Sequence, residues 1–349
     1  MTKIYNLHMD TREKILSYIK KKGEVSGKEL VEVLGITRQA VNKHIKKLVE
    51  EGLLIKEGRT KGAVYKVASS HRKFRALSKF EKVYSLKGLE EHEVFREVDL
   101  FLGLRKGLKE NVYQIINYAF TEMLNNAIEH SESAKCKVEV VLTPYRCGFK
   151  IRDYGIGIFY SIFEKFNLQD EVSAVGELIK GKVTTLPDGH TGEGVFFTSK
   201  AGDKVSFRSH KINLIFDNQK KDVYVEEKRY IKGTEVNFVI SRSSKRLLNK
   251  IFEEYAPEDF EYKFERTRVY VKLFQREYLS RSEARRLLSG LDKFREVILD
   301  FKGVRSIGQG FADEIFRVFE NAHPEVKIKL QNLAPAVEAV IKHVVDKKE

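Results

Sequence analysis

The sequence has few cysteines, no tryptophan and no long apolar run. Two cysteines, Cys136 and Cys147, in 349 residues argue against a disulfide framework, and we expect both on strands in a reducing cytoplasm. No apolar run approaches the roughly 18 residues of a membrane span, and the N-terminal MTKIYNLHMD lacks the apolar core of a signal peptide. We therefore predict a cytoplasmic protein without a membrane partner. Many lysines and glutamates with only three methionines are weakly typical of a thermophile.

The composition is that of a soluble globular chain with a large positive charge. Charged residues make up 33% and hydrophobic residues 42% of the sequence, and the length suffices for two or three domains with separate cores. The formal net charge of +14 indicates a polyanionic partner if the charge is local. Residues 1–70 contain fifteen lysines and arginines against eight aspartates and glutamates. This segment therefore carries half of the net positive charge of the chain.

The first seventy residues show a pattern of three helices followed by a hairpin. Apolar spacing predicts a helix over residues 11–21. Ser26 is expected to cap a second helix, with Glu29 completing a capping box. Thr37 is expected to cap a third helix that ends near residue 51. The stretch LLIKEGRTKGAVYKV then predicts two strands joined by a basic turn at residues 59–62.

This order of elements is that of a winged helix-turn-helix, and ITRQAVNKHIKKLVEEGLL resembles the recognition helix and following strand of many bacterial regulators. Such a helix lies in the major groove of DNA. The residues expected to contact DNA are Arg38, Gln39 and Asn42 at base edges, and Lys43, Lys46, Arg59 and Lys61 at phosphates. The alternative is a winged helix used for protein contacts, with its lysines as a solvated face. We favour DNA, because several basic and amide residues share the outward face.

A polar stripe marks a predicted helix at residues 118–130, YAFTEMLNNAIEH. Its members fall on one helical face: Glu122, Asn125, Asn126, Glu129 and His130. The opposite face can pack on a core: Ala119, Phe120, Met123, Leu124, Ala127 and Ile128. Glu122 could polarise a water, while Asn126 gives its carbonyl oxygen to a hard cation such as Mg²⁺. Taken alone, the stretch is better explained as an ordinary amphipathic surface helix.

Two glycine-bearing stretches follow this helix. A strand ending in Asp153 leads into Gly155 and Gly157, where a carboxylate can accept a hydrogen bond from an exocyclic amine and glycine lets a flat base approach. After a segment without a clear period, GHTGEG at residues 189–194 precedes a short helix, where backbone N–H groups can meet phosphates. Further strands are predicted at 204–209, 212–217, 223–226 and 234–240.

In this order the motifs resemble the GHKL ATPase fold, the superfamily of gyrase B, Hsp90, MutL, histidine kinases and anti-sigma-factor kinases. The resemblance spans roughly residues 90–241 and implies an α/β sandwich with a Bergerat-type ATP site. By resemblance, Glu122 activates a water, Asn126 is the Mg²⁺ ligand and Asp153 reads adenine, which Thr234 also meets, often through water. Gly155 and Gly157 line the base, Thr191, Gly192 and Gly194 form the phosphate loop, and residues 159–191 form a lid.

The cofactors that the resemblance implies are ATP and Mg²⁺. The metal would neutralise phosphate charge while the carboxylate orients a nucleophile, either water or a protein hydroxyl. His130 and His190 are candidate phosphate contacts; equally, His130 would only end its helix and His190 would be a lid residue without contact. Both an ATPase and a protein serine/threonine kinase stay open. Binding is implied more directly than hydrolysis, because no basic residue can be assigned to the γ-phosphate.

Residues 260–349 alternate strands and helices, which predicts a small sheet with parallel pairs. The first strand is expected at 264–273, and Ser280 opens a helix with Glu283 in a capping box. REVILDF is a buried strand and VKIKLQ another, with a last helix at 334–345. Between these strands, SIGQGFADEIFRVFENA predicts a helix whose inward residues are Phe311, Ile315, Val318 and Phe319.

This module resembles the STAS fold of anti-anti-sigma factors, in the STAS-like form found after GHKL domains, and LDFKGVRSIGQGFADEIF carries the resemblance. In those factors a GHKL kinase phosphorylates a serine at the start of that helix. Here Gly310 stands at this position, after Gln309, and Ser306 lies on the preceding turn. Phosphorylation in cis is therefore not expected, and we favour a docking or dimerisation domain.

The sequence thus predicts a multidomain α+β protein. Its parts are a winged helix-turn-helix domain (1–70), a connector (71–89), a GHKL ATP-binding domain (90–241), a linker helix (242–259) and a STAS-like α/β domain (260–349).

The function that this organisation implies is an ATP-binding transcription regulator whose DNA binding depends on Mg-ATP. The alternatives are an anti-sigma-type serine kinase acting on a separate STAS protein, a non-catalytic nucleotide-binding scaffold, and a histidine kinase, which the missing dimerisation hairpin weakens. Expected partners are double-stranded DNA, a protein at the STAS-like domain and a second copy of the chain, since GHKL relatives often dimerise.

Overall fold

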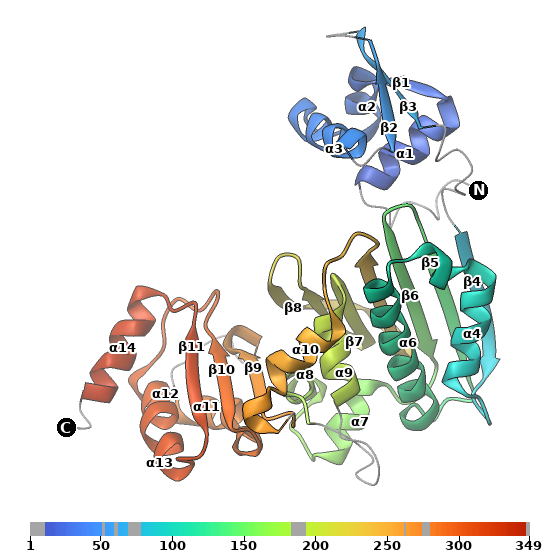
Figure 1. The fold of residues 1–349 in the computed structure, drawn as a ribbon. Helices are drawn as coiled ribbons and strands as arrows, with labels where there is room; N and C mark the ends of the chain where they lie inside the picture. The colour runs from blue at the N-terminus through green and yellow to red at the C-terminus, as the bar shows by residue number, and fades with distance from the viewer. Residues whose placement is uncertain are drawn as a thin grey trace. The chain divides into compact units, whose positions relative to one another are not determined.

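The computed structural model describes residues 11–50, 53–58, 62–68, 78–182, 193–261, 263–273 and 280–346 (Figure 1). The chain divides into two compact units. The first takes in the described residues up to Ser78 together with Leu142–Tyr145, and the second takes in the remainder. No helix among the described residues is long and apolar enough to cross a membrane.

The first unit is built from three helices and a small antiparallel sheet. Its elements are α1 (Thr11–Lys22), β1 (Glu24–Ser26), α2 (Gly27–Leu34), α3 (Arg38–Glu50), β2 (Leu54–Glu57) and β3 (Val64–Val67). The strand order is β1-β3-β2, with both pairings antiparallel. Val41, Ile45 and Leu48 of α3 are buried as predicted, and they pack in one core with residues of α1 and α2. The three-residue strand β1 was not predicted, because so short a strand carries no readable period.

The start of α2 corrects one detail of the predicted capping. The Ser26 hydroxyl accepts a hydrogen bond from the Glu29 amide at 3.2 Å, as expected of an N-cap. The Glu29 carboxylate, however, accepts from the Tyr18 hydroxyl at 2.9 Å and pairs with Lys22. The capping box is therefore only half made, and Glu29 instead ties α2 to α1. Thr37 caps α3 as predicted, accepting from the Ala40 amide at 3.2 Å.

The second unit contains a five-stranded sheet in the order β4-β5-β6-β8-β7. The strands are β4 (Ser78–Ser85), β5 (Lys135–Leu142), β6 (Arg146–Asp153), β7 (Lys204–Asp217) and β8 (Asp222–Ser241). Buried and part-exposed residues alternate along β5 and β6, so one face of these strands is covered. Cys136 and Cys147 lie on these two strands, buried and as free thiols.

Two features of this sheet differ from the prediction. Strand β4 lies at one edge of the sheet, so residues 78–85 are part of the sheet and not of a connector. The four short strands predicted between residues 204 and 240 are two long ones, β7 and β8, which pair antiparallel along their length. An irregularity at Ser209 and His210, where His210 has a φ of 49°, interrupts the alternation that the prediction relied on.

Helices cover the sheet. They are α4 (Glu91–Leu102), α5 (Leu104–Gly107), α6 (Glu110–His130), α7 (Ile158–Lys165), α8 (Glu171–Lys180) and α9 (Glu193–Ala201). The central helix α6 packs on β6 and β8, with α4 on one side and α9 on the other (Figure 1). Five of its six predicted core residues are buried, and Ile128 is half-buried. Helices α7 and α8 were not predicted and occupy most of the segment that showed no period.

The C-terminal part of the second unit contains a small sheet whose strands pair in parallel, as predicted. Its strand order is β11-β10-β9. Its elements are α10 (Leu248–Tyr255), β9 (Arg266–Tyr270), α11 (Arg281–Leu288), β10 (Glu296–Asp300), α12 (Gln309–Asp313), α13 (Glu320–Ala322), β11 (Lys327–Gln331) and α14 (Pro335–Val345). Short 3₁₀ turns stand at Glu258–Phe260, Val271–Leu273 and Leu291–Lys293. The capping box of Ser280 and Glu283 is formed in full.

One predicted core position in this module is wrong. Val318 is exposed, whereas Phe316 is buried in its place. Between α12 and α13 the helix makes a π-helical turn, Glu314–Phe319. A π turn bonds i to i+5, so it rotates the following side chains away from the positions that a period of 3.6 assigns.

Candidate nucleotide site and DNA-binding face

The central helix α6 presents its two key polar residues one turn apart. Glu122 and Asn126 are both half-buried, while Glu129 on the same stripe is exposed. The side-chain nitrogen of Asn126 is buried and has no hydrogen-bond partner among the described residues. An unpaired buried amide costs roughly 1–3 kcal/mol unless something satisfies it. Asn126 therefore has unmet bonding capacity of the kind a ligand can fill.

Asp153, at the end of β6, is the centre of a tightly bonded turn. Its Oδ1 accepts the backbone N–H groups of Gly155 and Thr234, each at 3.0 Å. The Thr234 hydroxyl in turn accepts from the Ile158 amide at 2.9 Å. Burial raises the pKa of the Asp153 carboxyl, and the hydrogen bonds from Gly155 and Thr234 oppose that rise. The structure thus brings together three predicted site residues: Asp153 at the end of β6, Gly155 in the loop that follows it, and Thr234 on the adjacent strand β8.

The two glycines after Asp153 pack closely against neighbouring segments, so that no side chain fits at either position. A Cβ on Gly155 would overlap the carbonyl oxygen of Ser131, just beyond α6, and the Ile156 amide donates to that same oxygen at 2.9 Å. Gly157 has a φ of +92°, and a Cβ there would overlap the Ser209 hydroxyl. This loop is therefore held between the end of α6 and strand β7, and any side chain on these glycines would displace it.

Glu122 lies against the start of α9. A Cβ on Gly194 would overlap the Glu122 carboxylate, so the backbone at Gly194 passes directly beside this predicted catalytic group. Tyr118, one turn earlier on α6, has its pKa raised first by burial and further by the charges of Glu122 and Glu193. The N-terminus of α9 thus meets the carboxylate of α6, which places backbone N–H groups of the helix start near that carboxylate.

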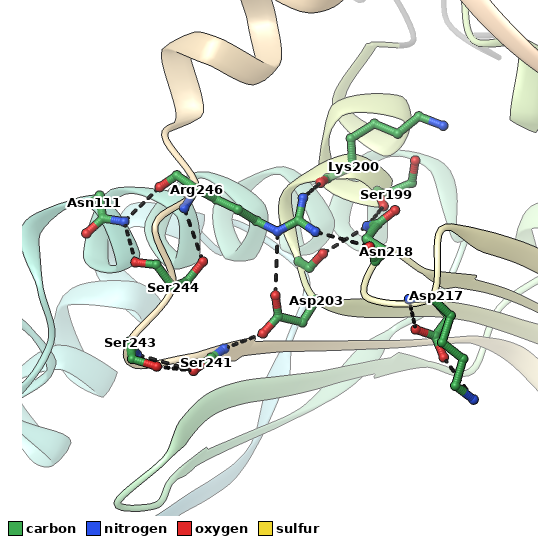
Figure 2. A network of polar contacts seen from close by, with 12 residues as sticks. Asn111, Ser199, Lys200, Asp203, Asp217, Asn218, Ser241, Ser243, Ser244 and Arg246 are labelled. Atoms are coloured by element: carbon green, nitrogen blue, oxygen red, sulfur yellow. Dashed lines mark hydrogen bonds and ion pairs between the residues drawn. The ribbon is translucent and has the colours of Figure 1, made fainter. Parts of the chain in front are cut away.

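A polar network holds the other end of α9 (Figure 2). The Asn218 side chain donates to the carbonyls of Ser199 and Gly202, both at 2.8 Å. The Arg246 guanidinium donates to the Lys200 carbonyl at 3.2 Å. These bonds satisfy carbonyls that a helix C-terminus leaves without helical partners, and the cation also complements the helix dipole.

The same arginine connects α9 to the chain that leads into the C-terminal module. Its Nε lies 3.5 Å from Oδ1 of Asp203, whose Oδ2 accepts from the Ser241 amide at 2.7 Å. Asn111, near the start of α6, donates to the backbone carbonyls of Ser244 and Arg246 at 3.0 and 2.7 Å (Figure 2). Helix α9 is therefore fixed at both ends relative to α6.

The sequence pattern did not indicate three residues near Gly157, namely Ser209, His210 and Glu171. Ser209 is fully buried, pairs directly with Thr234 across β7 and β8, and its hydroxyl has no partner among the described residues. His210 follows it, and its Nδ1 lies 2.9 Å from both carboxylate oxygens of Glu171. The available signal was the gap left between the two strands predicted at 204–209 and 212–217, which contains His210.

Of the remaining predicted residues, some lie in the part of the chain that the structure describes and others do not. His130 is half-buried and its Nε2 lies 3.9 Å from the carboxylate of Glu129, its neighbour on α6. His190, Thr191 and Gly192 lie outside the described residues, as do Arg59 and Lys61 of the predicted wing.

The predicted DNA-contacting residues of α3 form one exposed face. Arg38, Gln39, Asn42, Lys43 and Lys46 are all exposed, on the side opposite Val41, Ile45 and Leu48. The amphipathic period of α3 produces this separation. A solvated helix that carries three cations and two amides on one face has the chemistry needed for phosphates and base edges.

Comparison with known proteins identifies the two ends of the chain. Residues 10–55 match the family model described as winged helix-turn-helix DNA-binding. Residues 283–338 match a STAS-like domain of unknown function. None of the curated proteins compared with the chain matches it. The chain therefore carries an N-terminal winged helix-turn-helix, which suggests a DNA-binding regulator, and a C-terminal STAS-like domain.

Proposed function

We propose that the chain is a transcription regulator whose central domain is a GHKL-type ATP site and whose DNA binding depends on Mg-ATP. The observation that carries the nucleotide part is the geometry at Asp153. One oxygen of this buried carboxylate, at the end of a strand, accepts hydrogen bonds from two backbone amides. Its other oxygen remains as an acceptor for an exocyclic amine. Gly155 and Gly157 let the turn beside this carboxylate pack closely on Ser131 and Ser209, which holds Asp153 in place.

The residues at the other end of the site fit a phosphate chain with a divalent cation. Within the described residues, no group of three or more His, Cys, Asp or Glu side chains could hold a metal ion. A cation beside Asn126 would therefore take most of its oxygens from the ligand, as Mg²⁺ does in many phosphate sites. The side-chain carbonyl of Asn126 would supply one oxygen, and its buried amide nitrogen, which lacks a described partner, would donate to a phosphate oxygen.

In this proposal the residues of the site have different roles. Asn126 holds the cation, which when bound neutralises phosphate charge. Glu122 accepts a proton from, or orients, the attacking hydroxyl or water. Gly194 and the N-terminus of α9 supply backbone N–H groups to phosphate oxygens, and Asp153 with Thr234 selects the base. His130, His190, Thr191 and Gly192 are proposed as further nucleotide contacts.

The coupling of nucleotide to DNA is tested by one titration series. We expect the affinity of the full-length chain for its preferred duplex, selected from a random pool at fixed salt, to differ by about fivefold or more between Mg-ATP, Mg-ADP and no nucleotide, as typical allosteric couplings do. Equal affinities in all three conditions, with ATP binding demonstrated, would refute the coupling.

Two residues of α3 give a matched test of the DNA-binding face. Lys43→Ala removes a proposed phosphate contact, so the slope of log K against log[salt] should become less steep by about 0.9, with every duplex weakened alike. Asn42→Ala removes a proposed base contact, so it should weaken the selected duplex by roughly 1–3 kcal/mol and leave the slope nearly unchanged. If the two variants behave identically, the assignment of α3 to the major groove is wrong.

A further inference from the structure

Helix α8 is attached at its N-terminal end to the loop that carries Gly157. Glu171, its first residue, places both carboxylate oxygens 2.9 Å from Nδ1 of His210. The His210 ring stacks on Tyr230 with centroids 5.1 Å apart, which fixes its orientation. Its Nε2 stands 3.1 Å from the point where a Cβ on Gly157 would lie. The histidine therefore lies beside the glycine loop on one side and bonds to α8 on the other.

At its C-terminal end α8 is attached to the STAS-like domain. Lys180, its last residue, is buried, and its amine donates to the backbone carbonyls of Ser289 at 2.6 Å and Arg286 at 3.3 Å. It also pairs with Glu177 one turn earlier at 2.7 Å. The Thr267 hydroxyl of β9 donates to the Lys180 carbonyl. Because Ser289 is the C-cap of α11, a lysine from one module caps a helix of the other.

Helix α11 is in turn bonded to the helix that follows Gly308. The Arg285 guanidinium donates to the buried carboxylate of Glu314 at 2.7 Å. Glu314 begins the π-helical turn, within the helix that starts at Gln309. Helix α11 therefore has Lys180 at its C-terminal end and Glu314 beside its second turn. A shift of α8 cannot leave these contacts unchanged.

We propose that Glu171 and Lys180 are positioning residues at the two ends of α8, and that α8 couples occupancy of the base site to the packing of α11 in the STAS-like domain. This inference rests on the proposed nucleotide site. A base bound at Asp153 restrains the loop that carries Gly157, the loop restrains His210 beside it, and His210 restrains Glu171 and the helix behind it. Lys180 then keeps its place on the α11 carbonyls for a larger fraction of the time. Because linkage is reciprocal, loosening α11 weakens nucleotide binding by the same factor.

Amide hydrogen exchange of α11 in the full-length chain tests this coupling. We expect saturating Mg-ATP to slow exchange of the amides in the last turn of α11 by about fivefold. Glu171→Ala removes the bond to His210, so nucleotide should still bind while the response of α11 disappears. Glu171→Gln keeps an acceptor for Nδ1 and should restore most of the response. Glu164→Ala on α7, whose carboxylate instead meets Tyr160 on its own helix, is the matched control and should respond as the unmodified chain does.

The outcomes separate this inference from the proposed function. If Mg-ATP binds and the exchange of α11 does not change, the coupling is wrong and the nucleotide site stands. If Glu171→Ala keeps the full response, α8 is not the connecting element. If the unmodified chain binds no nucleotide, both proposals fail together. Lys180→Met would leave the α11 carbonyls without their ammonium donor and could unfold the module, so the conclusion is drawn from the Glu171 variants.

Discussion

Lys200→Met is expected to raise the free energy of unfolding of the second unit at pH 7 by roughly 2–4 kcal/mol. The Lys200 amine is buried and has no hydrogen-bond partner among the described residues. Its side chain leaves the network around Arg246 (Figure 2) and ends among four rings at 4.8–5.8 Å: Phe196, Phe216, Tyr255 and Tyr270. Burial, helped by the charge of Arg268, lowers the pKa of Lys200 to about 7, although Glu254 opposes this.

The sign of this effect follows from the protons bound in each state. An unfolded lysine keeps its proton up to about pH 10.5, whereas the folded Lys200 releases it near pH 7. Between these values the unfolded state binds more protons, so this group destabilises the fold most at pH 7 and less as the pH rises. Cation–π attraction from the rings favours the charged form by a few kcal/mol at most, which is less than the penalty of burial. Methionine keeps the apolar stem and the ring contacts without the charge.

Urea unfolding at several pH values measures this difference. The gain of Lys200→Met over the unmodified chain should shrink by up to about 1.4 kcal/mol for each pH unit above 7. Lys204→Met, an exposed lysine four residues later, is the control and should change stability by less than about 0.5 kcal/mol. A destabilised Lys200→Met variant, or a gain that does not vary with pH, would contradict this account.

Asp153→Asn is expected to weaken ATP binding by roughly 10- to 100-fold, because a hydrogen bond to a charged acceptor is worth about 1.5–3 kcal/mol. The asparagine carbonyl can still accept from the amides of Gly155 and Thr234, so the turn should survive. Its NH₂ group, however, would face the exocyclic amine of adenine as a second donor. It would suit the carbonyl of guanine better, so the preference for ATP over GTP should fall.

A matched variant separates this loss of recognition from a general loss of structure. Asp99 also accepts a backbone amide, that of Arg105 at 2.9 Å, together with the Tyr113 hydroxyl at 3.0 Å. We expect Asp99→Asn to leave nucleotide affinity unchanged in a calorimetric titration. Equal losses in the two variants, or an unchanged ATP-to-GTP ratio in Asp153→Asn, would show that Asp153 does not read the base.

Elements whose residue spacing within the segment itself indicates their structure could be predicted from the sequence. The Ser280 capping box, the buried face of α3 and the parallel order of the last three strands each follow from residue spacing. The strand predicted to end at Asp153 does end there, because the glycines that follow interrupt the alternation of a strand and permit a turn. For the candidate site, the strand end followed by glycines indicated Asp153 and Gly155, and the family resemblance implied Thr234; the structure brings these three residues together.

Features that depend on tertiary contact could not be predicted. In α8 the buried Lys180 interrupts the apolar pattern, and its burial depends on bonds to the backbone carbonyls of Arg286 and Ser289 as well as on its pair with Glu177. The bulge at His210 splits one long strand into two apparent short ones, and the π turn exchanges Phe316 for Val318. In each case a bond to a distant segment, or an irregular backbone, overrides the local period.

The central claim is that the middle of the chain binds ATP with a divalent cation. Isothermal titration of ATP into the purified full-length chain, with Mg²⁺ and again with excess chelator, tests it most directly. We predict saturable binding of one nucleotide per chain with Mg²⁺ and markedly weaker binding without it. No detectable binding at millimolar ATP with Mg²⁺ present would contradict the account.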